Sequence, residues 1–107
     1  MIERRHYVRF EVNLPLKFKD LNNDSEGKGE LHDISAKGVG FVTDRELSPN
    51  TSLDISIEMP NKSEYLCSKG QVIWSSKIDT DKYRVGVELE KIDFVGLSVL
   101  LSMQKII

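Results

Sequence analysis

The chain has 107 residues, 39% of them hydrophobic and 30% charged, which is the balance of one folded domain rather than of a disordered segment. Its formal net charge of −2 argues against duplex DNA or an acidic lipid surface as a partner. No run approaches the roughly 18 apolar residues that a membrane span needs, so we expect no membrane insertion. A single cysteine cannot form an internal disulfide, and there is no apolar leader, so we expect a cytoplasmic protein.

An alternation of apolar and polar residues predicts the first strand, from Val8 to Phe18. Pro15 lies within this strand and cannot donate a ladder hydrogen bond. The strand is therefore expected to form an edge at Pro15 or to carry a bulge there. The polar stretch from Leu21 to Lys28 then predicts a turn.

Further short apolar runs, separated by polar turns, predict the remaining strands. They cover residues 29–34, 39–43, 53–59, 65–74 and 83–89. Short strands at this spacing, with no helix between them, are typical of an all-β barrel or sandwich. The last segment, residues 93–107, begins with Asp93 as a suitable N-cap and is rich in Leu, Val and Ile. It predicts a C-terminal helix packed on the barrel or on a partner.

Two polar motifs flank the first predicted strands. Arg5 and Arg9 have the spacing R-x-x-x-R, and Arg4 directly precedes them. Residues 33–38 read D-x-S-x-x-G and occupy a turn between two strands. Either motif alone is weak, because arginine pairs and polar turns are common. Their order and separation are more specific than either pattern by itself.

This arrangement resembles the PilZ domain family, and the resemblance extends over essentially the whole chain. Beyond the motifs it includes Gly70–Trp74 and Tyr83–Val87, which are similar to later barrel strands of the family. Val8 departs from the pattern, since many members have proline before the second arginine. The resemblance implies a single domain over residues 1–107, with a six- to seven-stranded antiparallel β-barrel and a C-terminal α-helix. It also implies binding of the bacterial second messenger cyclic di-GMP.

The resemblance places the binding role on both motifs, and their chemistry is suitable. Arg5 and Arg9, with Arg4 as an auxiliary, present planar forks of donors that match guanine O6 and N7 or a phosphate. Asp33 can accept from guanine N1–H and the N2 amino group, which adenine lacks. Ser35 can hydrogen-bond base or phosphate. Gly38 is expected to supply a positive φ or a close approach of the backbone to the ligand.

Each of these residues also has a purely structural interpretation. The arginines could form a solvated basic segment, and Asp33 and Ser35 could satisfy backbone amides in a turn. Trp74 is a candidate stacking residue for a guanine, although a lone strand tryptophan is more often part of the core. Arg84 could contact phosphate or simply face solvent.

Other polar side chains give no sign of chemistry. Cys67 lies in an apolar strand and is interpreted as an inert buried thiol. His6 and His32 have no companions at metal-ligand spacing, so we expect no metal site and no cofactor. Neither a nucleophile with its base nor a phosphate-binding glycine loop is present, and we expect no enzymatic activity.

The sequence therefore predicts a cyclic di-GMP receptor or adaptor. We expect residues 1–9 to be mobile, to become ordered on the ligand, and to signal through a downstream protein partner. The domain is expected to be a monomer or a weak homodimer. The alternatives are a degenerate PilZ domain that only docks on proteins, and a small barrel for single-stranded nucleic acid. The latter is disfavoured by the negative charge and by aromatic residues that fall mostly on predicted buried faces.

Overall fold

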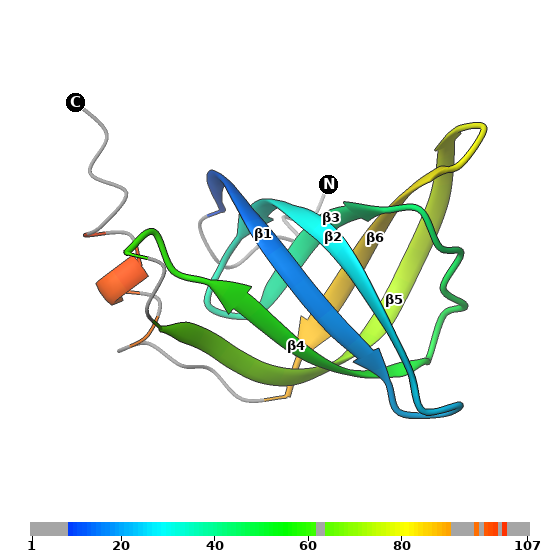
Figure 1. Ribbon diagram of the computed structural model, residues 1–107, viewed down its shortest axis with the longest axis horizontal. Coiled ribbons are helices and arrows are strands. Elements are labelled where there is room, and N and C mark those ends of the chain that lie inside the picture. The colour runs from blue at the N-terminus through cyan, green and yellow to red at the C-terminus, as the bar shows by residue number, and fades with distance from the viewer. Residues whose placement is uncertain (1–8, 62–63, 91–95, 97, 101, 103–107) are drawn as a thin grey trace, which may run out of the picture.

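The structure is a computed structural model that describes residues 9–61, 64–90, 96, 98–100 and 102. Six antiparallel strands form a closed barrel with the strand order β1-β2-β3-β6-β5-β4 (Figure 1). The strands are β1 (Phe10–Asp20), β2 (Ser25–Ile34), β3 (Gly38–Thr43), β4 (Ser52–Glu58), β5 (Tyr65–Asp79) and β6 (Lys82–Leu89). The predicted antiparallel β-barrel is confirmed, with the strand number at the lower end of the expected range.

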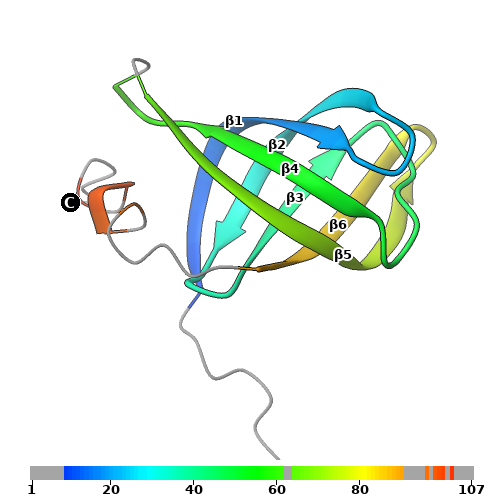
Figure 2. The same ribbon diagram turned by 90° about the horizontal axis from the view of Figure 1, so that it is seen from below.

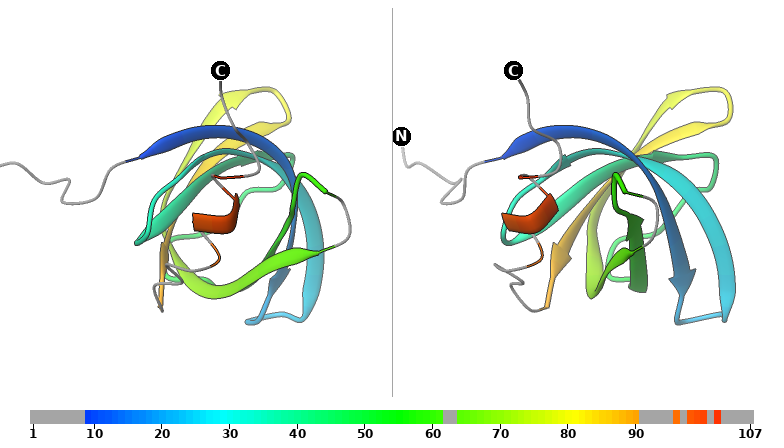
Figure 3. Two further views of the ribbon diagram at one scale, coloured as in Figure 1. Left: turned by 90° about the vertical axis from the view of Figure 1, so that its left-hand side faces the viewer. Right: turned by 60° about the vertical axis from the view of Figure 1, so that its left-hand side comes forward.

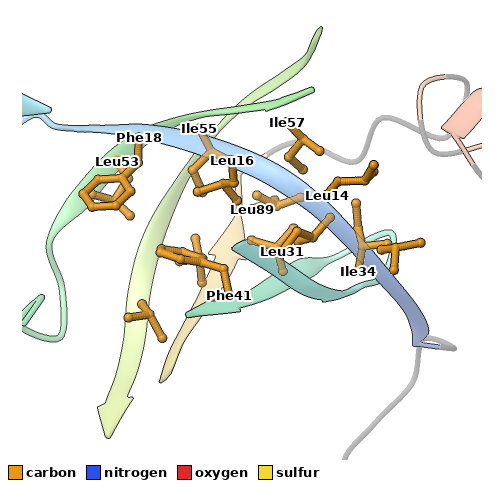
Figure 4. Packing of buried hydrophobic residues seen from close by; sticks show 14 of the residues in the cluster. Leu14, Leu16, Phe18, Leu31, Ile34, Phe41, Leu53, Ile55, Ile57 and Leu89 are labelled. Atoms are coloured by element: carbon orange, nitrogen blue, oxygen red, sulfur yellow. The ribbon is translucent and has the colours of Figure 1, made fainter. Parts of the chain in front are cut away.

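The core fills the interior of this barrel because the strands alternate buried and exposed residues. From Val12 onward in β1, and along β4, every second residue is buried, as a period of two requires. Phe18 of β1 and Phe41 of β3 meet at the centre with their ring centroids 5.6 Å apart. Figure 4 shows these rings with Leu16, Leu31 and Leu53, directed toward one another from different strands. The packed interior leaves functional side chains to the outer face and to the ends of the barrel.

The first strand confirms one of the two alternatives predicted for Pro15, an edge, and its bulge lies before that residue. The pairing of β1 with β2 shifts register between Glu11 and Leu14, which is a bulge-like irregularity. Pairing with β4 on the other side covers Leu16–Asp20, so Pro15 precedes the doubly paired part of the strand. Pro15, which has no N–H to donate, therefore lies where β1 is not paired with β4.

Two predicted turns are shorter in the structure than in the sequence interpretation. The β1–β2 turn spans residues 21–24, and Ser25–Lys28 belong to β2 because they pair with β1. Asp20 Oδ1 accepts a hydrogen bond from the Asn22 amide at 2.9 Å and helps to close this turn. β5 continues to Asp79 rather than ending at Trp74, and its hairpin with β6 extends beyond the barrel (Figure 1).

The C-terminal segment is helical in the part that is described. Residues 96, 98–100 and 102 have helical backbone, and the short helical piece lies across one open end of the barrel (Figure 3). Leu100 is fully buried and belongs to the core cluster. The rest of the predicted 93–107 helix lies outside the described residues. Within the described part of the chain, no helix has the length and apolarity to cross a membrane.

Cys67 is exposed, so its interpretation as a buried thiol is wrong. On β5 the neighbouring Leu66 is partly buried against the core, and the strand period turns Cys67 to the outer face. There its Sγ lies 3.6 Å from the Ser56 hydroxyl of the paired strand β4.

Candidate functional site

Arg9, the last residue of the arginine motif, lies beside Asp33, the first residue of the second motif, where β1 begins and β2 ends. The strands are antiparallel, so the start of β1 lies beside the end of β2 (Figure 2). Phe10 pairs with Ile34, and Glu11 pairs with Asp33. This pairing brings Arg9 beside Asp33, and Arg9 Nη1 donates a hydrogen bond to Asp33 Oδ1 in an ion pair. Both side chains are 35% exposed, so a ligand in solvent can reach them. Arg4 and Arg5 lie outside the described residues.

A row of paired residues extends from Asp33 across the outside of the barrel. Asp33 of β2 pairs with Gly40 of β3, Gly40 with Gly86 of β6, and Gly86 with Trp74 of β5. A Cβ added to Gly40 would lie 2.9 Å from Asp33 Oδ2, and one added to Gly86 would lie 2.8 Å from Trp74 Cζ2. The carboxylate and the indole thus lie over the two glycines. Gly40 and Gly86 form a low floor because they have no side chains. The Asp33 carboxylate forms an acidic wall on one side of this floor, and the Trp74 indole forms an aromatic wall on the other.

This floor is the bottom of an open groove of about 660 Å³. Its volume is within the range of small-molecule sites, which is roughly 300–1,000 Å³. The groove is lined by Arg9, Glu11, Asn13, His32, Asp33, Val39, Gly40, Trp74, Arg84 and Gly86. Polar and charged side chains converge on it from β1, β2 and β6 and from Arg9, which precedes β1, and β5 contributes Trp74.

Trp74 is 43% exposed and lies outside the core, which corrects the structural interpretation of this residue. Val72 is buried, so a regular alternation would also turn Trp74 inward. The β5–β6 pairing shifts register between Val72 and Trp74, and the additional residue, Ile73, places the indole on the outer face. Phe10 and Tyr65 are exposed as well, so the expectation that most aromatic residues are buried is wrong for the described residues.

Ser35 and Gly38 have a structural role in the turn after β2. Ser35 is 4% exposed, and its Oγ accepts hydrogen bonds from the amides of Lys37 at 3.2 Å and Gly38 at 3.1 Å. The Ser35 amide in turn donates to the Gly38 carbonyl at 2.9 Å. This turn fixes the end of β2, and thereby the position of Asp33 two residues earlier. Neither residue lines the groove.

The expected positive φ at Gly38 is wrong, because none of the described glycines has one. The backbone of Gly38 does make a close approach, but to β6 of the protein rather than to a ligand. A Cβ added to Gly38 would lie 2.6 Å from the Val87 carbonyl oxygen of β6. Glycine is therefore required at this position so that β3 and β6 can close the barrel.

Away from the groove, exposed charges of the barrel are paired with one another. Lys19 donates to Asp24 at 2.9 Å, and Lys69 donates to Asp54 at 2.7 Å. These hydrogen bonds to carboxylates raise the pKa of both amines. Among the described residues, no group of three or more His, Cys, Asp or Glu side chains could hold a metal ion.

The sequence profile of the PilZ domain matches residues 3–103, and the chain belongs to this family. The structure is similar to the PilZ domain with c-di-GMP of YcgR from Escherichia coli, with a TM-score of 0.75, 17% identity and coverage of 95% of this chain and 92% of that one. It is also similar to the Bacillus subtilis inhibitor of motility MotI/DgrA, with a TM-score of 0.71, 22% identity and coverage of 94% of this chain. This chain spans about half of that protein, 49% of its length.

A third similar structure is the MrkH–c-di-GMP complex of K. pneumonia, with a TM-score of 0.68, 15% identity and coverage of 97% of this chain and 55% of that one. At these identities the likeness establishes the fold. No curated protein sequence matches this chain.

Proposed function

We propose that this PilZ domain is a receptor for cyclic di-GMP and that the ligand occupies the groove over Gly40 and Gly86. The observation that carries the proposal is the convergence of Arg9, Asp33 and Trp74 on one accessible surface. Family membership supports it, as do the similar folds of the c-di-GMP complexes of YcgR and MrkH. The groove holds donors, acceptors and an aromatic face, which are the groups that a guanine-bearing dianion requires.

Each wall of the groove matches a different part of the ligand. The Asp33 carboxylate can accept from guanine N1–H and the N2 amino group, and this pairing selects against adenine. Arg9 presents a planar fork for guanine O6 and N7 or for a phosphate. The exposed face of Trp74 can stack on a base, an interaction worth about 1–3 kcal/mol.

The ion pair between Arg9 and Asp33 keeps both side chains at the site before the ligand arrives. Pairs as exposed as this one contribute about 0.2–1 kcal/mol, because water screens them. A charge-assisted hydrogen bond to the ligand is worth about 1.5–3 kcal/mol. It is therefore favourable for Arg9 and Asp33 to exchange their contact with each other for contacts with a guanine or a phosphate of the ligand. Asp33 needs no large rearrangement for this exchange.

We further propose that the segment preceding Arg9, which the ion pair with Asp33 already holds at the site, becomes ordered over the bound ligand through Arg4 and Arg5. Arg5 precedes Arg9 by four residues, so its Cα lies within about 14 Å of that of Arg9 and can reach the groove. Ordering costs about 1–2 kcal/mol per residue, so several charge-assisted hydrogen bonds from Arg4 and Arg5 to the ligand, each worth about 1.5–3 kcal/mol, are needed to offset it. The ordered segment then provides a new surface for a downstream protein partner. In this proposal the domain acts as a receptor and not as an enzyme.

Isothermal titration calorimetry with cyclic di-GMP tests the proposal. The variants are Arg5→Ala, Arg9→Ala and Asp33→Ala. The matched controls are Lys69→Ala and Asp54→Ala, which break an equally simple exposed ion pair away from the groove. We expect each groove variant to weaken binding at least 10-fold, while the controls stay within about 2-fold of the unmodified protein.

Two results would contradict this account. Strong binding that survives all three groove substitutions would mean that the site is elsewhere. A folded protein that binds no cyclic di-GMP would be a degenerate PilZ domain that acts by protein docking. Cyclic di-AMP and a single-stranded oligonucleotide serve as comparison ligands, and both should bind far more weakly than cyclic di-GMP.

A further inference from the structure

A second arginine faces the groove from the side opposite Asp33. Arg84 lies on β6 two residues before Gly86, so the strand period places both on the outer face. It pairs with Val42 of β3 and Ser76 of β5, one row along from the glycine floor. Its side chain is exposed and forms no hydrogen bond or ion pair with the part of the chain that the structure describes. The guanidinium is therefore accessible to a ligand.

The charges that line the groove are divided unequally between its walls. On the β1–β2 wall Arg9 is neutralised by Asp33, and Glu11, which pairs with Asp33, adds a further carboxylate. On the β5–β6 wall Arg84 and Trp74 stand without an acidic residue among the described lining residues. An acidic wall accepts hydrogen bonds from guanine but repels phosphate, whereas the β5–β6 wall attracts an anion.

The distance between the walls suits a ligand with separate base and phosphate groups. Asp33 is on β2 and Arg84 is on β6, with β3 between them. Two strand spacings separate the backbones of β2 and β6 by about 10 Å, so a single functional group of a ligand cannot contact both strands. One extended molecule that carries both groups can place a base at Asp33 and a phosphate at Arg84.

We propose that Arg84 binds a phosphate of cyclic di-GMP and thereby sets the orientation of the ring, with one guanine on Asp33 and a phosphate on the β6 side. This inference rests on the proposed function and assigns a contact that lies outside both sequence motifs. Arg84 forms no hydrogen bond or ion pair among the described residues, so its substitution is expected to leave the fold intact.

The test compares Arg84→Gln and Arg84→Lys by calorimetry with cyclic di-GMP, alongside Arg9→Ala. Lys82→Gln is the matched control, because Lys82 is an exposed cation on the same hairpin and does not line the groove. We expect Arg84→Gln to weaken binding about 10-fold. Arg84→Lys should stay within about 3-fold, since lysine keeps the positive charge that attracts a phosphate. Lys82→Gln should bind as the unmodified protein does.

The possible outcomes separate this inference from the proposed function. Unchanged binding by Arg84→Gln, with binding lost in Arg9→Ala, overturns the role of Arg84 and leaves the receptor function standing. An equal loss in Arg84→Lys and Arg84→Gln overturns the assignment of Arg84 as a charge contact to phosphate, because it shows that a positive charge at this position is not sufficient for binding. An equal loss in Lys82→Gln shows a general effect of charge and also overturns the contact. Absence of binding by the unmodified protein overturns the proposed function itself.

Discussion

Substitution of Gly86 by alanine tests whether the glycine floor sets the position of Trp74. The new Cβ would lie 2.8 Å from Trp74 Cζ2 and closer still to Cε2 and Nε1, whereas ordinary contact begins at 3.4 Å. The indole must therefore move by more than half an ångström. Because Trp74 is 43% exposed, it can move outward into solvent rather than strain the barrel.

The expected energies make stability and binding respond differently to this change. Overpacking typically costs about 1–3 kcal/mol, and here part of it is relieved by the outward movement. Replacing a glycine without positive φ stabilises by about 0.4–1 kcal/mol through the unfolded chain. We expect the free energy of unfolding to change by less than about 1 kcal/mol. Loss of part of a base–indole stack, worth about 1–3 kcal/mol, should weaken cyclic di-GMP binding about 5- to 10-fold.

Gly27→Ala is the matched control, because a Cβ there would lie 2.8 Å from Phe18 Cε1 in the same cross-strand geometry. Phe18 is buried in the core and cannot move outward, so this variant should lose about 1–3 kcal/mol of stability while the folded fraction binds normally. Trp74 is the only tryptophan, so its emission reports on its position directly. Unchanged emission and unchanged affinity in Gly86→Ala would refute the positioning role of the glycine.

Three further predictions concern the fold around the groove. Ser35→Ala should lower the free energy of unfolding by about 1–3 kcal/mol in urea denaturation, because two turn amides lose their acceptor; no change would remove its role in the turn. Phe41→Ala should cost about 3–5 kcal/mol, since this ring is fully buried, while Tyr65→Ala on the surface should cost less than about 1 kcal/mol in the same assay. Arg9→Ala should change stability by less than about 1 kcal/mol despite its effect on binding, and a larger loss by thermal denaturation would show that the ion pair is structural.

The parts of the site that the sequence predicts are those defined by local pairing. A turn over Ser35–Gly38 joins antiparallel strands, so Asp33 must face a position shortly after the turn, and Gly40 is found there. The same antiparallel geometry brings the residue before β1 to the end of β2, and the contact between Arg9 and Asp33 follows from it. These contacts depend on short hairpins. The alternation of apolar and polar residues, together with the turn residues, specifies the register of such hairpins.

The other wall of the groove depends on pairing between distant segments. Gly86 faces Gly40 only because β6 closes the barrel against β3, and no local pattern specifies that register. Trp74 faces solvent because of an extra residue in β5, which the alternation of apolar residues conceals. The apolar pattern also fails to place Cys67, because its apolar neighbours do not show which face of β5 it occupies.

The central claim, that cyclic di-GMP binds over the row Asp33–Gly40–Gly86–Trp74, is tested most directly by NMR titration of the labelled protein. The account predicts saturable shifts of the backbone amides of this row and of the Trp74 indole N–H. The amides around Phe18 and Gly27, in the β1–β2 hairpin on another part of the barrel, should stay fixed. Shifts confined to that hairpin, or no shifts at saturating ligand, would contradict the account.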